Sequence, residues 1–312
     1  MTAHKAKRHL PPKTHPWQFD DHEAARRAAM DAEKALLTAA ATQSLLGRHS
    51  KDQSFADEVF VLSPHRVSAP PLLLIGGMGP QVGLRGFAAA CDCFGSSRKI
   101  VLVQACSVPD RSVAVRVELA GEPHAAATRR QVVTALNAAV DLAWQVAGEP
   151  ETATLVVLCN TAHHFLKDIR IPAQTRLVNL VDTAARHCRD MSDVIVLSTF
   201  GTRATGLYSH SLARWNVRCL TPSEDAEALL MDIVYRGVKA GNLDYAATQL
   251  PSLLKALAQW APQADGMICG CTEIPLLLQH APGITPPWPL IDPLSCAMRE
   301  LQQARFRTDL QS

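Results

Sequence analysis

The sequence predicts an α/β fold in which two pseudo-symmetric, doubly wound domains with mainly parallel sheets hold the functional site in the cleft between them. Short aliphatic and β-branched runs, typical of strands buried on both faces, alternate with stretches of helical periodicity. The chain shows no hairpin signals, so we expect helices to connect its strands. A strand that stops at a cysteine followed by polar residues occurs twice, at Cys159 and at Cys271. This repetition indicates two equivalent halves.

Composition favours a globular protein with neither nucleic acid nor membrane as a partner. A chain of 312 residues can form one large core or two domains, and 47% hydrophobic residues is ordinary for such a protein. The 31 basic and 29 acidic residues give a formal charge of only +2, so the chain lacks the large positive charge typical of proteins that bind nucleic acid. The longest apolar runs, such as those at 72–75 and 155–158, are far shorter than the roughly 18 residues that span a bilayer.

The N-terminus and the cysteines together favour a cytoplasmic location. The first residues are polar and lack the apolar segment of a secretory signal. Nine cysteines, an odd number without a framework spacing, fit a reducing compartment better than a disulfide scaffold.

The chain begins with a segment of different composition, residues 1–70, which we expect to be an N-terminal extension. A basic, proline-containing stretch over 1–19 favours an extended tail. An alanine-rich helix is expected from about residue 22 to 46, and a short strand is possible at 58–62. Consecutive prolines at 70–71 break the chain before the main fold.

Two α/β domains are expected after this extension. The first is placed at 71–175 plus 287–312 and carries Cys159, and the second is placed at 176–286 and carries Cys271. The expected elements of the main fold, in chain order, are strands at 72–75, 99–104, 155–158, 177–181, 194–199, 266–269 and 290–291, with helices after Pro80, at 125–146, 224–237 and 250–260, and at the C-terminal end.

A glycine-rich turn, Gly76-Gly77-Met78-Gly79-Pro80, joins the first of these strands to its helix. Such a turn lets backbone N–H groups approach an anion, so we expect a carboxylate or a phosphate there. A dinucleotide is disfavoured, because Val82 stands at the sixth position of the fingerprint counted from Gly77.

The two strand-end cysteines, Cys159 and Cys271, suggest a two-base site. The carboxyl end of a parallel strand opens into the crevice where α/β proteins bind ligands. A thiolate is a competent base when its pKa falls from about 8.5 toward neutrality, and a protonated thiol on the opposite face can return a proton. Removing an α-hydrogen from one face and delivering one to the other inverts a stereocentre without requiring a cofactor. Donors for the carbanion are expected among Asn160, Thr161, Thr202, Thr272 and the loop N–H groups.

Simpler readings compete with each of these assignments. Arg111 could grip a carboxylate or form a surface ion pair near Asp110, and Lys239 could bind an anion or compensate a helix dipole. No metal is expected, because the two Cys-x-Cys pairs lack zinc spacing. Free cysteine is commonly a small buried hydrophobe, and we assign that role to Cys91, Cys93, Cys106, Cys188, Cys219 and Cys296.

Six motifs occur in the same order as in one known family: Gly76-Gly77-Met78-Gly79-Pro80, Pro109-Asp110-Arg111, Cys159-Asn160-Thr161-Ala162-His163, Gly201-Thr202, Val238-Lys239-Ala240-Gly241-Asn242 and Gly270-Cys271-Thr272-Glu273. From about Leu72 to Glu300 the sequence therefore resembles the aspartate/glutamate racemases. The resemblance implies a cofactor-independent amino-acid racemase, a homodimer, with Cys159 and Cys271 as the acid/base pair.

The resemblance also implies how an amino-acid substrate is held. Arg111 and Lys239 would bind its side-chain carboxylate, and Met78 of the glycine loop is assigned to substrate binding. The residues expected near the α-carboxylate are Asn160, Thr161, Thr202 and Thr272.

Two alternatives stay open at the level of sequence. The first is another activity of the superfamily, such as a hydantoin racemase or a maleate isomerase. One-cysteine decarboxylases are disfavoured because both cysteines are present. The second is a non-catalytic, racemase-like binding protein, suggested by Val82-Gly83, where relatives commonly have Ala-Thr, and by the extra N-terminal segment.

Overall fold

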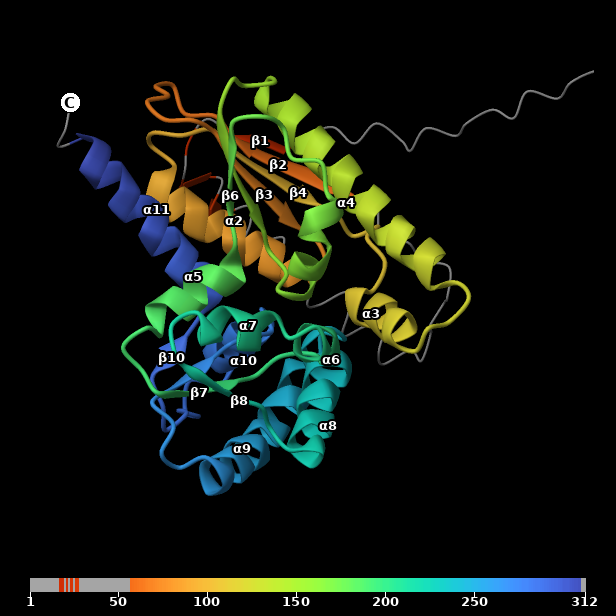
Figure 1. The fold of residues 1–312 in the computed structure, drawn as a ribbon. Helices are drawn as coiled ribbons and strands as arrows, with labels where there is room; N and C mark the ends of the chain where they lie inside the picture. Colours follow the sequence, from red (N-terminus) through yellow and green to blue (C-terminus); the bar gives the residue numbers. More distant parts are fainter. Residues whose placement is uncertain (1–16, 20, 22, 25, 28–56, 310–312) are drawn as a thin grey trace, which may run out of the picture.

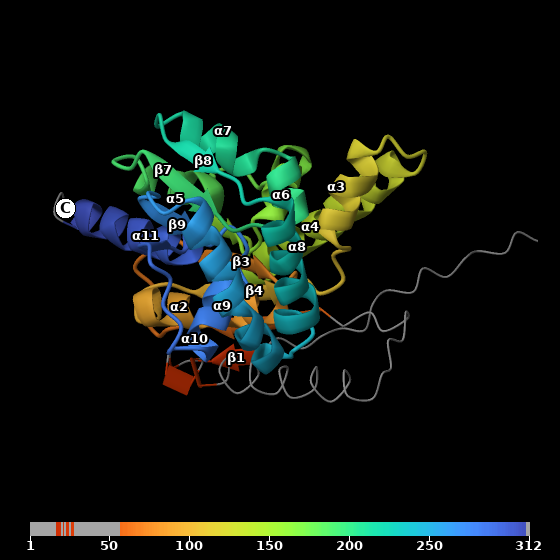
Figure 2. The same cartoon turned by 90° about the horizontal axis from the view of Figure 1, so that it is seen from below.

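A computed structural model of the chain describes residues 17–19, 21, 23–24, 26–27 and 57–309. Most of the alanine-rich helix expected at 22–46 lies outside these residues. Figure 1 shows two sheets, one above the other, with helices packed around both of them. Figure 2 shows the same arrangement from below.

Each sheet is described by the order of its strands. The first sheet runs β1 (Trp17–Phe19), β2 (Glu58–Leu62), β4 (Ile100–Gln104), β3 (Leu72–Gly76), β5 (Ala153–Val157) and β6 (Thr175–Val178). The second sheet runs β10 (Leu290–Ile291), β9 (Gly266–Ile268), β7 (Asp193–Val196) and β8 (Arg218–Leu220).

The two sheets contain the same four-stranded unit. One unit is β4-β3-β5-β6 and the other is β8-β7-β9-β10. When the strands of each unit are numbered in chain order, both units have the spatial order 2-1-3-4. Every pair within these units is parallel. The predicted mixed α/β class with mainly parallel sheets is therefore confirmed. We call the units from β3 to β6 and from β7 to β10 the first and second repeat.

The strand pairing shows which sheet each element near the expected domain boundaries belongs to. Strand β6 extends the first sheet, so the sequence boundary between 175 and 176 falls inside a strand of the first repeat. Strand β10 pairs with β9 in the second sheet, although the sequence placed 287–312 with the first domain. The last helix, α11 (Pro293–Asp309), packs on α2 (Pro80–Phe94) and on α5 (Leu180–His187).

Strands β3, β4 and β5 of the first repeat are buried because helices cover both faces of the sheet. Alternate side chains of a strand point to opposite faces. Accordingly Leu72 and Leu74 of β3 join one apolar cluster with α2, whereas Leu73 and Ile75 join a second cluster with α4 (Ala125–Ala147). A strand buried in this way reads as a continuous apolar run, which is why it was recognisable in the sequence.

The remaining helices are named here by their bounds: α3 (Arg111–Leu119), η1 (Thr161–Asp168), α6 (Phe200–Ala204), α7 (Leu207–Ala213), α8 (Glu224–Asp232), the π-helix η2 (Ile233–Val238), α9 (Leu243–Trp260) and α10 (Ile274–His280). None of the helices in the described part of the chain has a stretch apolar and long enough to cross a bilayer.

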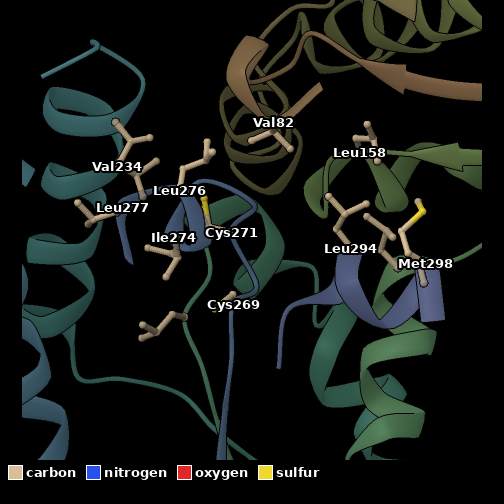
Figure 3. Packing of buried hydrophobic residues seen from close by; sticks show 14 of the residues in the cluster. Val82, Leu158, Val234, Cys269, Cys271, Ile274, Leu276, Leu277, Leu294 and Met298 are labelled. Atoms are coloured by element: carbon tan, nitrogen blue, oxygen red, sulfur yellow. The ribbon is translucent and has the colours of Figure 1, made fainter. Parts of the chain in front are cut away.

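One apolar cluster crosses from the first repeat to the second. It contains Val82 of α2 and Leu158 after β5, together with Cys271 and Leu276 from the second repeat. Figure 3 shows Cys271 beside Leu276 and Ile274, with Val82 facing them. The two repeats therefore share a packed core at their junction, and Cys271 lies at its edge.

The N-terminal extension adds two strands to the first sheet. The strand expected at 58–62 is confirmed, and it pairs antiparallel with β4, so that Glu58 lies opposite Gln104. The extended tail expected over 1–19 is wrong for residues 17–19, which form β1 and pair with β2. Because β2 is antiparallel to β4, its first residues lie where β4 ends. There the carboxylate of Asp57 accepts hydrogen bonds from the N–H and the hydroxyl of Ser107, both at 2.8 Å.

Three expected elements end or change earlier than the sequence indicated. The strand expected at 177–181 ends at Val178, because the Asn179 side chain accepts from the N–H groups of Val181 and Asp182 and starts α5. The strand expected at 194–199 ends at Val196. The helix expected at 224–237 becomes a π-helix from Ile233 onward, a form often found at functional sites.

Candidate active site

The carboxyl ends of the two sheets face a common cavity. Its lining includes seven of the residues expected from the sequence: Arg111, Cys159, Asn160, Thr161, Lys239, Cys271 and Thr272. It also includes residues that the sequence analysis did not assign to catalysis or substrate binding: Asp110, Ser112, Thr199, Gly270 and Glu273.

The topology explains why the two cysteines meet. Cys159 follows β5, which pairs with β3, and the glycine loop follows β3. Neighbouring strands whose connections leave in opposite directions make the switch point where open α/β sheets bind ligands. Cys271 follows β9, the equivalent strand of the second repeat. The two thiols therefore approach the cavity from equivalent positions in different sheets.

Two expected residues, Met78 and Thr202, are absent from the lining of the cavity. The carbonyl of Met78 accepts a 2.7 Å hydrogen bond from Nη2 of Arg111, so Met78 supports a lining residue through its backbone. Thr202 lies 2.8 Å from the hydroxyl of Thr161 and stands behind it.

Arg111 is buried at the first turn of α3. Its Nη1 donates to the carbonyls of Val108 and Pro109, and its Nη2 to that of Met78. Burial would lower its pKa, but the neighbouring Cys159 and the Asp110 carboxylate keep the pKa above its ordinary value. The guanidinium is thus fixed by backbone carbonyls and faces Cys159.

The backbone of Cys159 is fixed by His163, a buried histidine whose role the sequence did not indicate. The N–H of Leu180 donates to Nε2 of His163 at 3.0 Å, so that nitrogen carries no proton. Nδ1 then carries the proton and donates to the carbonyl of Cys159 at 2.9 Å. Burial lowers the pKa of His163, in agreement with this neutral form. His163 therefore holds the turn that presents Cys159.

Cys271 has a different electrostatic environment. Its Sγ donates to Oε2 of Glu273 at 3.0 Å, and the hydroxyl of Thr272 donates to the same oxygen at 3.1 Å. Burial, followed by the Glu273 charge, raises the pKa of Cys271 well above its ordinary value. Cys271 is therefore a protonated thiol in the resting protein. The two cysteines are electrostatically unequal: one faces a guanidinium and the other a carboxylate.

Lys239 supplies a second cation, at the end of the π-helix. Its Nζ lies 3.9 Å from Oδ2 of Asp110 and 4.3 Å from the ring centre of Tyr235. Burial would lower the pKa of Lys239, but Glu273, followed by Tyr235 and Asp110, raises it above the ordinary value. Lys239 is therefore a permanent cation at the cavity wall.

Side-chain hydrogen bonds join the two repeats beside the cavity. Thr199 of the second repeat lies 3.1 Å from the hydroxyl of Thr161 and accepts from that of Ser112 at 3.3 Å. Tyr208 of α7 donates to Oδ1 of Asn160 at 3.0 Å. The volume open to the centre of a water molecule in this cavity is about 20 Å³. This is room for about one water molecule.

Two buried donors at this cavity have no hydrogen-bond partner in the described residues. They are Nδ2 of Asn160 and Nε of Arg111, and both side chains line the cavity. Buried polar groups are almost always paired, so an orphaned donor in a cavity points to an acceptor that arrives with a ligand. A carboxylate offers such oxygens. Across the described part of the chain, no group of three or more His, Cys, Asp or Glu side chains is placed to hold a metal ion.

The sequence model of a family described as Asp/Glu/Hydantoin racemase matches residues 98–301. The chain belongs to this family. The matched range contains the two cysteines, Arg111 and Lys239, and the family predicted from the motifs is confirmed.

Solved racemase structures resemble this chain in fold. The aspartate racemase of Picrophilus torridus is 20% identical, with a TM-score of 0.60 over 76% of this chain and 94% of that one. A putative Asp/Glu racemase from Yersinia pestis is 22% identical, with a TM-score of 0.54 over 76% and 99% of the two chains. A similar uncharacterised protein from Pectobacterium carotovorum subsp. carotovorum is 25% identical over 119 residues, 37% of this chain and 77% of that protein.

Gly83 of α2 lies directly against a side chain of the first sheet. A Cβ on Gly83 would lie 1.7 Å from Oε1 of Gln104. Gln104 is buried, and its Nε2 donates to the carbonyl of Pro80 at 2.8 Å. The glutamine therefore occupies the space that a larger residue 83 would need.

This contact predicts a strong coupling between positions 83 and 104. Gly83→Ala should lower the free energy of unfolding by about 1–3 kcal/mol because of overpacking, although alanine normally stabilises a helix by about 1 kcal/mol relative to glycine. In a Gln104→Ala background the same change should cost nothing or stabilise. Urea denaturation of both single variants and the double variant measures the coupling; additive effects would contradict the packing described here.

Proposed function

We propose that the protein is a cofactor-independent amino-acid racemase that acts on aspartate, glutamate or both. The observation that carries the proposal is the placement of Cys159 and Cys271, from equivalent strands of the two repeats, on one cavity. Membership of the racemase family supports the same reaction type.

The two thiols supply both proton transfers. A thiolate on one side of the α-carbon removes its hydrogen, and a thiol on the other side delivers a proton to the opposite face. In the resting protein Cys271 holds a proton, whereas Cys159 faces a guanidinium. We therefore assign Cys159 as the first base and Cys271 as the first acid for one enantiomer, with the roles reversed for the other.

The charges at the cavity match a dicarboxylic amino acid. Arg111 and Lys239 are cations, and Asp110 and Glu273 are carboxylates. A dicarboxylic amino acid carries two negative groups and one ammonium group, so each finds opposite charges in this lining. The free Nδ2 of Asn160 and Nε of Arg111 would donate to carboxylate oxygens, and such donors stabilise the negative charge that develops when the α-hydrogen leaves.

The direct test is inversion of single enantiomers. The purified protein is incubated separately with L- and D-aspartate, L- and D-glutamate and L-alanine, and the enantiomers are separated by chiral chromatography. We expect inversion of at least one dicarboxylic acid in both directions, and none of alanine. Activity should survive dialysis against hydroxylamine, which removes pyridoxal phosphate, and against EDTA. Inversion of alanine without turnover of either dicarboxylic acid would reject the substrate assignment.

A further inference from the structure

Arg111 takes its place in the cavity wall from a short loop. Residues 105–110 join β4 to α3. The carbonyls of Val108 and Pro109 in this loop accept from Nη1 of Arg111 at 3.4 and 3.1 Å. The third carbonyl on this guanidinium belongs to Met78 of the glycine loop. The position of the loop therefore decides the position of the guanidinium.

The loop is held from outside at Ser107. The N–H of Ser107 donates to Oδ1 of Asp57 and its hydroxyl donates to Oδ2, both at 2.8 Å. One carboxylate thus binds the backbone and the side chain of the same residue. Hydrogen bonds to a charged acceptor are shorter than neutral ones and roughly twice as strong. Water could satisfy the same two donors, but it would not fix the loop to the sheet.

Asp57 belongs to the N-terminal extension rather than to either repeat. It precedes β2, whose antiparallel register sets Glu58 opposite Gln104 at the carboxyl end of β4. The carboxylate is thereby placed at the edge of the first sheet that faces the cavity. The family model matches from residue 98 onward, so Asp57 lies outside the matched residues.

Attachment of β2 to the sheet does not need this carboxylate. Strand β2 pairs with β4 over five residues, and those of Val59–Leu62 are buried. The contact of Asp57 with Ser107 is therefore additional to the pairing of the strands. It acts on the loop that supplies the carbonyls for Arg111.

We propose that Asp57 is a positioning residue of the active site, which fixes the loop of residues 105–110 through Ser107 and thereby holds the guanidinium of Arg111 in the cavity wall. The proposal rests on the racemase function proposed above, in which Arg111 binds a carboxylate of the substrate. The extension then has a part in substrate binding although none of its described residues is in the cavity lining.

Asp57→Ala tests the proposal, because alanine leaves Ser107 without its acceptor. A guanidinium that binds the substrate alike in the ground state and in the transition state affects KM more than kcat. We expect KM for the dicarboxylic acid that the wild type inverts to rise by about 10-fold, within the roughly 10²-fold that a misplaced group can cost. The change in kcat should be smaller.

Two further variants show whether the hydrogen bonds themselves are responsible. Asp57→Asn should keep most of the wild-type KM, since its Oδ1 can accept from the N–H of Ser107 and its Nδ2 can donate to the hydroxyl. Ser107→Ala removes one of the two hydrogen bonds and should raise KM less than Asp57→Ala does. The double variant should have the KM of Asp57→Ala, because both changes break the same contact.

Asp265→Ala is the matched control. Oδ2 of Asp265 accepts from the N–H groups of Ser192 and Asp193 at 2.7 and 3.0 Å. This carboxylate also fixes backbone from another segment, but it lies where β7 and β9 begin, at the edge of the second sheet opposite the cavity. Asp265→Ala should therefore lower stability, measured by thermal unfolding, without raising KM.

Two readouts do not depend on turnover. Hydrogen exchange followed by mass spectrometry should show faster exchange in residues 105–110 of Asp57→Ala than in the wild type. Phenylglyoxal, which modifies accessible guanidinium groups, should label the buried Arg111 faster in the same variant. Asp57→Asn and Asp265→Ala should match the wild type in both measurements.

The outcomes separate this proposal from the proposed function. A wild-type KM in a folded Asp57→Ala protein overturns the positioning role even where exchange in the loop is faster, since Asp57 then acts on stability alone. An equal rise of KM in Asp265→Ala overturns it as well. A wild-type protein that inverts no amino acid rejects the racemase assignment. In that case faster labelling of Arg111 in Asp57→Ala still supports the hold of the loop on this guanidinium, and unchanged labelling overturns it.

Discussion

Replacing either Cys159 or Cys271 by serine is expected to lower racemisation of aspartate or glutamate by roughly 10²- to 10⁴-fold, the scale of one lost acid or base. A serine hydroxyl is too weak a base at neutral pH to replace a thiolate, and both thiols are needed for every inversion. Kinetics of each variant with both enantiomers measure the loss. Cys93→Ser, at a partly buried cysteine of α2 away from the cavity, should retain wild-type rates.

Full racemisation in either serine variant would reduce the corresponding cysteine to a packing residue. For Cys271 the alternative has a concrete basis, because this side chain belongs to the apolar cluster shared by the two repeats (Figure 3). A stability measurement alone would not separate the roles. The rate of racemisation separates them, since a change from sulfur to oxygen alters packing only slightly but removes the base.

Lys239→Met is expected to raise KM for a dicarboxylic substrate by about 10- to 100-fold, which corresponds to roughly 1.4–2.7 kcal/mol. The change removes the cation that faces Asp110 and Glu273, and it leaves these two carboxylates to repel the incoming anion. The pKa of Asp110 should also rise, because Lys239 is the strongest of the charges that hold it below the ordinary value. Initial rates over a range of aspartate concentrations measure the effect.

The matched control is Lys255→Met, which removes a lysine from an exposed position of α9. This variant should keep the wild-type KM. If Lys239→Met and Lys255→Met behave alike, the positive charge at the π-helix has no part in holding the substrate. A loss of stability in Lys239→Met at unchanged KM would assign the lysine to the Asp110 contact alone.

Several parts of the fold were predictable because they depend on local sequence. The strand before Cys159 is buried on both faces, so it appears as an uninterrupted apolar run, and the polar residues after it mark its end. The repetition of this pattern at Cys271 predicted the second sheet. The glycine turn after β3 predicted a strand-to-helix junction for the same reason.

Other features depend on contacts between distant segments, which leave no local pattern. The pair of Tyr208 with Asn160 joins residues 48 positions apart, and that of Asp57 with Ser107 joins residues 50 apart. The end of β6 depended on a side-chain cap at Asn179 in a run that is otherwise apolar and strand-like. Glu273 was visible as part of a motif, but its contact with Cys271 follows from the turn after β9, which only the folded chain shows.

The division of labour between the two thiols is tested most directly by α-hydrogen exchange in D₂O, followed by NMR with single enantiomers of aspartate or glutamate. The wild-type protein should replace the α-proton of both enantiomers while it inverts them. Because each thiol reaches one face of the α-carbon, Cys159→Ser and Cys271→Ser should each exchange at most one enantiomer, without inversion, and the two variants should act on opposite enantiomers. Exchange of the same enantiomer by both variants, or inversion by either, would contradict the assignment of Cys159 and Cys271 to opposite faces.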